Sequence, residues 1–445
     1  MKPNPPVPGT TPIDIAALID NSKIGAFQIG LFALCGLCLI IDGFDVQAMG
    51  YAAPAILQDW KIDKASLGPV FGAGLFGMLI GSLVFSPVAD RIGRRPVLIG
   101  ATVFFGVCML ATAHVGTIDG LLALRFITGI GLGCIMPNAM ALAGEFSPSR
   151  NKASTMMIVS CGFTLGAIVG GLVSAMLIPT FGWRAVFHAG GIAPLVIAAF
   201  MIFYLPESLQ FLALRGGREE RITASLKRIV PDLRFDGDVR YAMHEQVSKG
   251  IPIAHLFQDG RAIGTLLLWA INFMNLINLY FLSNWLPTLI NDAGHATTYA
   301  VLAGTTLQVG GAIGTLALGW IIDRKGFVPV LVVSFLLATF AIAAIGQLAA
   351  TLIPVFVVIF IAGFCIVGGQ PAVNALAASY YPTSLRSTGI GWSLGVGRVG
   401  SIIGPVLGGA LIGMHWSSAS LFLAAAVPAA ISALLMLGMR SATAR

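Results

Sequence analysis

The chain has 445 residues, of which 57% are hydrophobic and 10% are charged, and its mean hydropathy is +0.89. A typical soluble domain has about 25% charged residues, so these values exclude a soluble globular enzyme, a disordered protein and a disulfide-stapled secreted domain. They indicate a polytopic membrane protein. The net charge is +7, and the positions of the basic residues decide what this excess means.

The hydrophobic segments divide the chain into two halves. A membrane-spanning helix needs roughly 20 mostly apolar residues, and six such segments fall within 26–205 and six within 262–439. Residues 1–25 form a polar, proline-rich N-terminal segment, 206–261 a partly helical hydrophilic linker, and 440–445 a short tail. The sequence therefore predicts an all-α membrane protein with twelve transmembrane helices in two six-helix bundles. The expected spans are 26–52, 66–89, 97–115, 119–144, 155–178, 184–205, 262–286, 299–322, 328–349, 352–378, 387–412 and 417–439.

The basic residues lie on one side of these spans. With both termini cytoplasmic, the cytoplasmic segments hold 21 of the 26 Lys and Arg residues, nine of them in the linker. Such a one-sided excess sets the orientation of a membrane protein. The net positive charge thus marks topology, and no nucleic-acid partner is expected.

Neither the cysteines nor the histidines predict a site for metal or covalent chemistry. All six cysteines lie in apolar runs, and the CxxC pair of Cys35 and Cys38 has no second pair or nearby histidine. The six histidines are scattered and show no HExxH or related spacing. We therefore expect no metal, no cofactor and no enzymatic activity. A membrane-embedded enzyme or a nutrient receptor is the weakest alternative.

The two halves of the chain repeat each other. A near-constant offset from the first span to the eleventh is typical of two six-span repeats around a central cavity, a design that suits alternating access. The matched pairs, 233 or 234 residues apart, include Pro54 and Pro287, Asp59 and Asp292, Asp90 and Asp323, Arg91 and Arg324, Gly129 and Gly363, Pro137 and Pro371, Lys152 and Arg386, Gly166 and Gly400, and Gly170 and Gly404.

The loop after the second span resembles the signature loop of the major facilitator superfamily. Its pattern, GxxxDRxGRR, is present as Asp90, Arg91, Gly93, Arg94 and Arg95, with Ser86 in place of the first glycine. The resemblance covers essentially the whole chain and implies the major facilitator fold. It also implies a latch of ion pairs and helix dipoles that closes the inner gate, whereas positive-inside anchoring explains Arg94 and Arg95 about as well. The residues assigned to this gating role are Asp90, Arg91, Gly93, Glu145, Asp323, Arg324 and Arg386.

The first span carries a second resemblance. Asp42, Gly43, Phe44 and Asp45 resemble the DGxD motif of the aromatic acid:proton symporter family, whose members import benzoate-type anions such as 4-hydroxybenzoate and protocatechuate. This resemblance implies a multi-pass protein of the bacterial inner membrane that works as a monomer in the lipid bilayer. Its implied ligands are a small aromatic acid anion and a proton, and the proton gradient is its energy source.

Four charged residues lie inside the predicted spans, where each costs at least about 2.5–3.5 kcal/mol at a helix centre. Asp42 and Asp45 are three residues apart and share a helix face. Arg125 lies at the depth of Asp45, so an ion pair is sterically possible, whereas Arg398 has no acidic residue at its depth. We assign proton coupling to the two aspartates and the substrate carboxylate to Arg398, with Arg125 either helping or paired with the aspartates. In the alternative interpretation, the aspartates and Arg125 only hold helices together.

An aromatic acid also needs a flat apolar slot and polar partners for its ring substituents. The further substrate-binding candidates are Phe44, Trp392, Asn272, Gln370 and Asn374. Gln370 and Asn374 are four residues apart and suited to a ring hydroxyl. For the polar residues the alternative is hydrogen bonding between helices, and for the aromatic residues it is packing or lipid contact.

The sequence thus predicts a proton-coupled importer of aromatic carboxylates that works by alternating access. Two motifs leave other transporters open. Residues 206–208, Pro-Glu-Ser, resemble a sugar-porter motif, and 400–409 resemble the GxxxGPxxGG stretch of drug:proton antiporters, displaced from span 5 to span 11. The alternatives are a transporter of another organic anion or a sugar, or a drug:proton antiporter.

Overall fold

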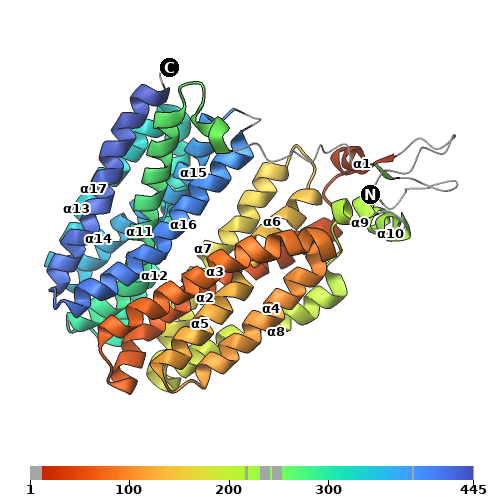
Figure 1. Cartoon of the computed structure of the whole chain (residues 1–445). Coiled ribbons are helices and arrows are strands. Elements are labelled where there is room, and N and C mark those ends of the chain that lie inside the picture. The colour runs from red at the N-terminus through yellow and green to blue at the C-terminus, as the bar shows by residue number, and fades with distance from the viewer. Residues whose placement is uncertain (1–12, 216–218, 231–240, 243–252, 383–384, 444–445) are drawn as a thin grey trace.

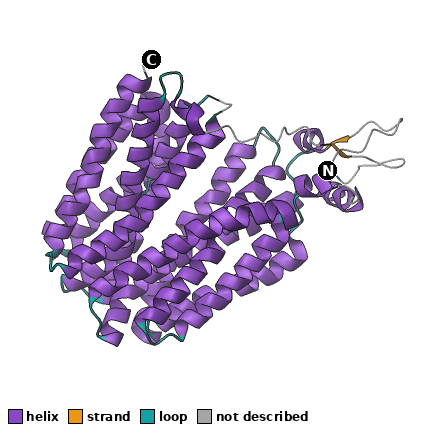
Figure 2. Cartoon of the chain, in the orientation of Figure 1, coloured by secondary structure: helices purple, strands orange, loops and turns teal. Residues whose placement is uncertain are grey.

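The computed structural model describes residues 13–215, 219–230, 241–242, 253–382 and 385–443. Within these ranges the chain is helical apart from loops and one short pair of strands (Figure 2). Twelve helical segments are long and apolar enough to cross a membrane, which confirms the predicted fold class. The elements are β1 (Ile13–Asp14), α1 (Ile15–Asn21), α2 (Ala26–Trp60), η1 (Lys64–Ser66), α3 (Leu67–Ile92), α4 (Arg94–Ala113), α5 (Ile118–Leu132), α6 (Ile135–Glu145), α7 (Lys152–Phe181), α8 (Arg184–Tyr204), α9 (Leu209–Arg215), α10 (Glu219–Ile229), β2 (Tyr241–Ala242), η2 (Ile253–Phe257), α11 (Ala262–Asp292), α12 (Thr297–Lys325), α13 (Phe327–Leu348), α14 (Leu352–Ile366), α15 (Gly369–Tyr380), α16 (Arg386–Gly413) and α17 (Ser418–Thr443).

Some sequence-based expectations fall outside the described residues. They concern parts of the N-terminal segment, the linker and the tail, and six of the basic residues counted above. These residues are Lys2, Arg218, Arg234, Arg240, Lys249 and Arg445.

The helices form two bundles of the same internal design (Figure 1). In the N-terminal bundle α2 packs on α7, α3 on α5, and α4 on α8. In the C-terminal bundle the corresponding pairs are α11 with α16, α12 with α14, and α13 with α17. The sequence repeat is therefore also a repeat of helix packing.

Glycines let the paired helices approach closely. Gly166 of α7 faces the backbone carbonyl of Ile40 in α2, and Gly400 of α16 faces that of Phe273 in α11, with no room for a Cβ at either glycine. Small residues at such crossings allow backbone-to-backbone packing in lipid. The stretch 400–409, which resembles a drug-antiporter motif, thus packs α16 on α11 and, through Gly409, against the start of α3.

Two of the predicted continuous spans are broken, so that expectation was wrong. The fourth span consists of α5 and α6, interrupted at 133–134, and the tenth consists of α14 and α15, interrupted at 367–368. A proline follows each break, Pro137 in α6 and Pro371 in α15. A proline ring clashes with the carbonyl four residues earlier and donates no hydrogen bond, which interrupts a helix just before it. The two breaks are equivalent in the two repeats.

The two bundles meet at one end of the molecule. We call the end that holds α1 and the last turn of α17 the terminal face, and the other end the opposite face (Figure 1). The bundles converge toward the opposite face and diverge toward the terminal face. At the opposite face Gln58 Nε2 donates to Asn291 Oδ1 at 3.1 Å, and Lys64 Nζ lies 2.6 Å from Asp292 Oδ2. Gln58 and Asn291 are 233 residues apart, so equivalent residues of the two repeats touch each other across a pseudo-twofold axis.

Short elements cover the N-terminal bundle at the terminal face. β1 pairs with β2 of the linker in parallel register, and α1 buries Ile15 and Ile19. Asp20 accepts hydrogen bonds from the backbone N–H and the Oγ of Ser149, at 2.6 and 2.8 Å, in the loop between α6 and α7. These hydrogen bonds stabilise the carboxylate and hold the pKa of Asp20 below its usual value. The N-terminal segment is therefore fastened to the bundle that follows it.

Candidate functional site

Arg125 and Asp45 form a buried ion pair inside the N-terminal bundle. Arg125 Nη1 donates to Asp45 Oδ1 at 2.9 Å, and Nη2 donates to Oδ2 at 2.8 Å. The side chains are 6% and 0% exposed. This pair joins α5 to α2 at the matched depths that the sequence indicated. Because both terminal nitrogens are engaged in a bidentate pair, Arg125 is held by Asp45 in this conformation.

Asp42 lies one turn earlier on α2 and is also buried, with 1% exposure. Its Oδ1 is fully enclosed and has no hydrogen-bond partner in the part of the chain that the structure describes. Its electrostatic neighbours are Arg398, on α16 of the other bundle, and Asp45. The expectation that Arg398 has no acidic residue at its depth was therefore wrong. The bundles are inclined toward each other, so a count of residues along each helix does not measure depth across the molecule.

Arg398 is half-buried and keeps its hydrogen-bonding capacity. Its backbone carbonyl accepts from the Ser401 Oγ at 2.6 Å, but its guanidinium makes no hydrogen bond or ion pair with any described residue. Its charge interacts with Asp42 and with the Tyr280 hydroxyl of α11. A guanidinium with this much unused capacity is suited to bidentate binding of a carboxylate.

The predicted polar candidates of the C-terminal bundle bind one another. Asn272 Nδ2 donates to Ser393 Oγ at 2.9 Å, and Gln370 Nε2 donates to Asn272 Oδ1 at 2.7 Å and to Asn374 Oδ1 at 3.2 Å. Asn275 Nδ2 donates to Gln370 Oε1 at 2.7 Å. This network joins α11, α15 and α16, as the alternative interpretation of interhelical hydrogen bonding anticipates.

Two members of this network were not among the predicted site residues. Asn275 lies 233 residues after Asp42, and is therefore the C-terminal counterpart of that aspartate. The repeat was the signal that could have found it. Ser393 gave no signal in the sequence, because a serine in a transmembrane helix has many possible partners.

The two aromatic candidates lie away from the charged residues. Phe44 packs against Gly170 of α7 and Gly190 of α8, inside the N-terminal bundle. At 3.6 residues per turn, it points about 160° away from Asp42 around α2. Trp392, 47% exposed, stacks on Trp269 of α11 with ring centroids 6.0 Å apart. It lies about 120° around α16 from Arg398. Their assignment to the substrate slot is therefore corrected, because neither shares a helix face with the charge it was meant to assist.

The signature loop forms a polar cluster at the terminal face. Arg94 pairs with Glu145 of α6, which also accepts a hydrogen bond from Ser208 Oγ at 2.7 Å. The backbone N–H of Arg95 donates to Glu207 Oε1 at 3.1 Å. The Pro-Glu-Ser motif thus binds the signature loop within the N-terminal bundle. Its packing role is visible in the structure without a sugar.

The gating residues take their positions in a conformation whose bundles are apart at this face. Gly93 has a φ of +108°, and a side chain there would overlap Glu207, which explains the glycine. The ion-pair partner seen for Glu145 is Arg94 rather than the expected Arg91. The remaining gating candidates share exposure to solvent: Asp90, Arg91, Asp323, Arg324 and Arg386.

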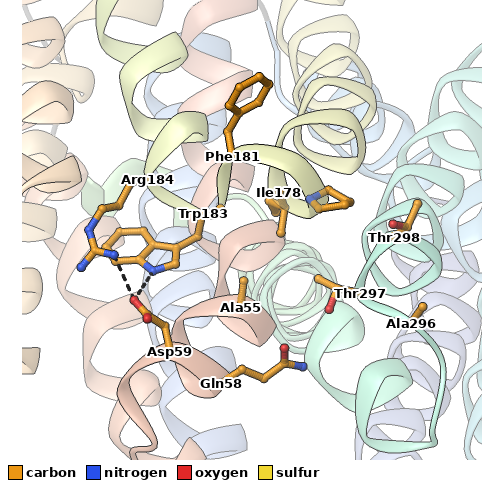
Figure 3. A pocket seen from close by; sticks show the side chains of 12 residues that line it. Ala55, Gln58, Asp59, Ile178, Phe181, Trp183, Arg184, Ala296, Thr297 and Thr298 are labelled. Atoms are coloured by element: carbon orange, nitrogen blue, oxygen red, sulfur yellow. Dashed lines mark hydrogen bonds and ion pairs between the residues drawn. The ribbon is translucent and has the colours of Figure 1, made fainter.

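A larger cavity lies at the opposite face and was not predicted. It measures about 580 Å³ and is lined by the end of α2, the turn between α7 and α8, and the start of α12 (Figure 3). Asp59 Oδ2 accepts hydrogen bonds from Trp183 Nε1 at 2.9 Å and from Arg184 Nη1 at 3.0 Å. The cation in this cavity is therefore already neutralised. The walls belong to both bundles, so the shape of the cavity depends on how the bundles meet.

Comparison with known families decides the identity of the fold. The model of the Major Facilitator Superfamily matches residues 35–300 and again 268–445. The chain belongs to the Major Facilitator Superfamily. The two matches agree with the two bundles and with the repeat offset.

Individual superfamily members resemble the chain over nearly its full length. The 4-hydroxybenzoate transporter PcaK of Pseudomonas aeruginosa is 40% identical, covering 98% of each chain. The gallate transporter of Pseudomonas putida is 39% identical, covering 97% of this chain and 96% of its own. Among solved structures, a bacterial homologue of the human lysosomal transporter Spinster, described as inward-facing and occupied, has a TM-score of 0.73 at 15% identity, covering 93% and 97%. That structural likeness supports the major facilitator fold alone.

Membership of the superfamily gives the charged residues a common setting. Asp42 and the Asp45–Arg125 pair belong to the N-terminal bundle, and Arg398 belongs to the C-terminal bundle. In transporters built from repeats, ligand sites lie at the interface between the repeats. Asp42 and Arg398 face each other across that interface.

Proposed function

We propose that the chain is a proton-coupled importer of aromatic carboxylates of the 4-hydroxybenzoate or benzoate type, working by alternating access. Its relatives are named as transporters of 4-hydroxybenzoate and gallate, and both names denote an aromatic ring that carries a carboxylate. The observation that carries the proposal is the unpaired guanidinium of Arg398 at the interface of the two bundles. A neutral sugar has no need of such a cation, whereas a carboxylate does.

Proton coupling is assigned to Asp42 and Asp45. A buried carboxylate without a hydrogen-bond partner is costly in its charged form, and Asp42 is such a group. Uptake of a proton by Asp42 removes its attraction for Arg398 and leaves the guanidinium to the substrate. Asp45 is held by Arg125 in the present conformation, so the pair must loosen before Asp45 takes up a proton. No cofactor is needed, because the proton gradient supplies the energy.

Orientation and conformation complete the proposal. We assign the terminal face to the cytoplasm of a bacterial inner membrane, because the basic residues gather at that face. The contact between the bundles at the opposite face then makes the structure inward-facing. A single chain contains both halves of the site, so a monomer suffices.

The transport reaction is tested in vesicles that contain the purified protein. An imposed pH gradient, acidic outside, is expected to drive accumulation of labelled 4-hydroxybenzoate, and dissipation of the gradient is expected to stop it. Accumulation that persists without any gradient would contradict proton symport. Competition by benzoate, gentisate and chlorinated phenoxyacetates then orders the ring substituents.

The role of Arg398 is tested by Arg398→Gln, with Arg440→Gln as a matched control at an exposed arginine of α17. Loss of a charge-assisted bidentate contact is expected to cost about 1.5–3 kcal/mol, a 10-fold to 150-fold loss of affinity for 4-hydroxybenzoate. Binding of the neutral 4-hydroxybenzamide is expected to change little. Equal losses for the acid and the amide would show that the arginine does not bind the carboxylate.

A further inference from the structure

A small cavity lies directly beside the Asp45–Arg125 ion pair. Its volume is about 20 Å³, and its polar lining consists of Asp45, Arg125 and Asn284. The rest of the lining is apolar or glycine, including Gly74 and Met78 of α3. Room for one water molecule takes roughly 10–15 Å³ and two to four polar partners. The cavity meets both conditions.

One wall of this cavity belongs to the other bundle. Asn284 lies on α11, whereas the other lining residues come from α2, α3 and α5. At the crossing of α2 and α11, a Cβ on Gly50 would lie 3.2 Å from the Cα of Asn284. This is the close contact between the bundles on the side of the opposite face. The cavity is therefore enclosed only while the two bundles are together there.

The polar groups around the cavity have hydrogen-bonding capacity left over. Asn284 Nδ2 donates to the Tyr280 carbonyl at 2.8 Å, while its Oδ1 accepts no hydrogen bond from a described residue. Arg125 uses Nη1 and Nη2 for Asp45, and its Nε donates to no described residue. A water molecule between them would accept from the Arg125 Nε and donate to the Asn284 oxygen.

We propose that this cavity binds one water molecule, which bridges the Asp45–Arg125 pair to Asn284 and makes Asn284 a positioning residue for proton uptake. This inference rests on the proposed function. When the opposite face opens, Asn284 leaves with its bundle and the single water site joins bulk water. When that face closes, Asn284 seals the ion pair together with one water. Asp45 thus exchanges protons with the far side of the membrane only in the open conformation.

The water site is tested by radiolytic labelling of the full-length protein with the opposite face closed. Water held in the cavity generates hydroxyl radicals beside Met49 and Met78, two buried methionines that line it. Both are expected to oxidise at least fivefold faster than Met436, which is equally buried in α17. Rates for Met49 and Met78 no faster than that of Met436 would overturn the proposal.

Two variants separate the water from the fold. Gly74→Ala places a methyl group in the cavity, where its nearest neighbours, atoms of Arg125, lie at 3.6–4.0 Å, so the helix tolerates it. Asn284→Leu removes the polar wall at similar size. Both are expected to lower the oxidation of Met49 and Met78 at least fivefold. Asn291→Leu, which breaks another contact between the bundles without lining the cavity, is expected to leave the oxidation unchanged.

A transport readout distinguishes positioning from a general structural defect. We expect Gly74→Ala and Asn284→Leu to lower gradient-driven accumulation of 4-hydroxybenzoate at least threefold relative to exchange at equal pH. An unchanged ratio in both variants would overturn the role in proton uptake. Absence of any 4-hydroxybenzoate transport by the wild type would instead refute the proposed function, while the labelling result would still decide whether the water is present.

Discussion

The buried ion pair between Asp45 and Arg125 supports an asymmetric prediction. Its side chains are 0% and 6% exposed and share two hydrogen bonds of 2.8 and 2.9 Å. Asp45→Asn leaves a buried guanidinium that stays charged at any accessible pH. Loss of one partner from a buried pair costs about 3–5 kcal/mol, and the near-complete burial places this variant in the upper part of that range. Arg125→Gln is expected to cost less, because the remaining carboxyl group can be neutralised by a proton.

The assay is a double-mutant cycle on the free energy of unfolding in one detergent. The double variant Asp45→Asn/Arg125→Gln carries two neutral amides and is expected to recover at least 2 kcal/mol relative to the sum of the single losses, since neither charge is left buried alone. A loss below about 1 kcal/mol for Asp45→Asn, or strict additivity in the double variant, would refute this reasoning. Proton-coupled uptake is expected to be absent in the double variant despite its recovered stability.

Three further predictions concern other parts of the molecule. Gly166→Leu is expected to prevent assembly of the N-terminal bundle, because its Cβ would overlap the α2 backbone, whereas Gly30→Leu, with open space around it, is expected to express normally. Lys64→Ala breaks the ion pair with Asp292, which is partly exposed and worth about 0.2–1 kcal/mol; thiol labelling at the opposite face is expected to rise up to fivefold, and unchanged labelling would contradict a role for this pair in closure. The lowered pKa of Asp20 means that its hydrogen bonds stabilise docking of α1 above the usual aspartate pKa of about 4 and are lost as the pH falls through the lowered value; trypsin cleavage near α1 at pH 7 is expected to be faster in Asp20→Asn, and equal rates would contradict it.

The fold was predictable because the bilayer leaves few alternatives to apolar helices. The number of spans, the division into two bundles and the Asp45–Arg125 contact all follow from hydropathy, repeat and helix rise. The breaks in the fourth and tenth spans were missed although Pro137 and Pro371 marked them. Prolines inside transmembrane helices are common, and Pro54 lies within a continuous α2.

The site was less predictable than the fold. Helix rise alone placed Asp45 beside Arg125, but it said nothing of direction around the helix for Phe44 and Trp392. It also could not show that the inclination of the bundles brings Arg398 toward Asp42. Relations between bundles depend on rigid-body placement, and a sequence pattern confined to one helix does not encode that placement.

The hydrogen bond between Gln58 and Asn291 joins equivalent positions of the two repeats. Self-complementary contacts of this kind are how identical subunits meet in a twofold-symmetric dimer. The chain therefore keeps the interface of a homodimer while its two copies have diverged in chemistry. One copy has Asp42 where the other has Asn275. Gene duplication followed by fusion accounts for both facts: symmetry survives where the halves must fit together, and it has been given up where they hold their different charges.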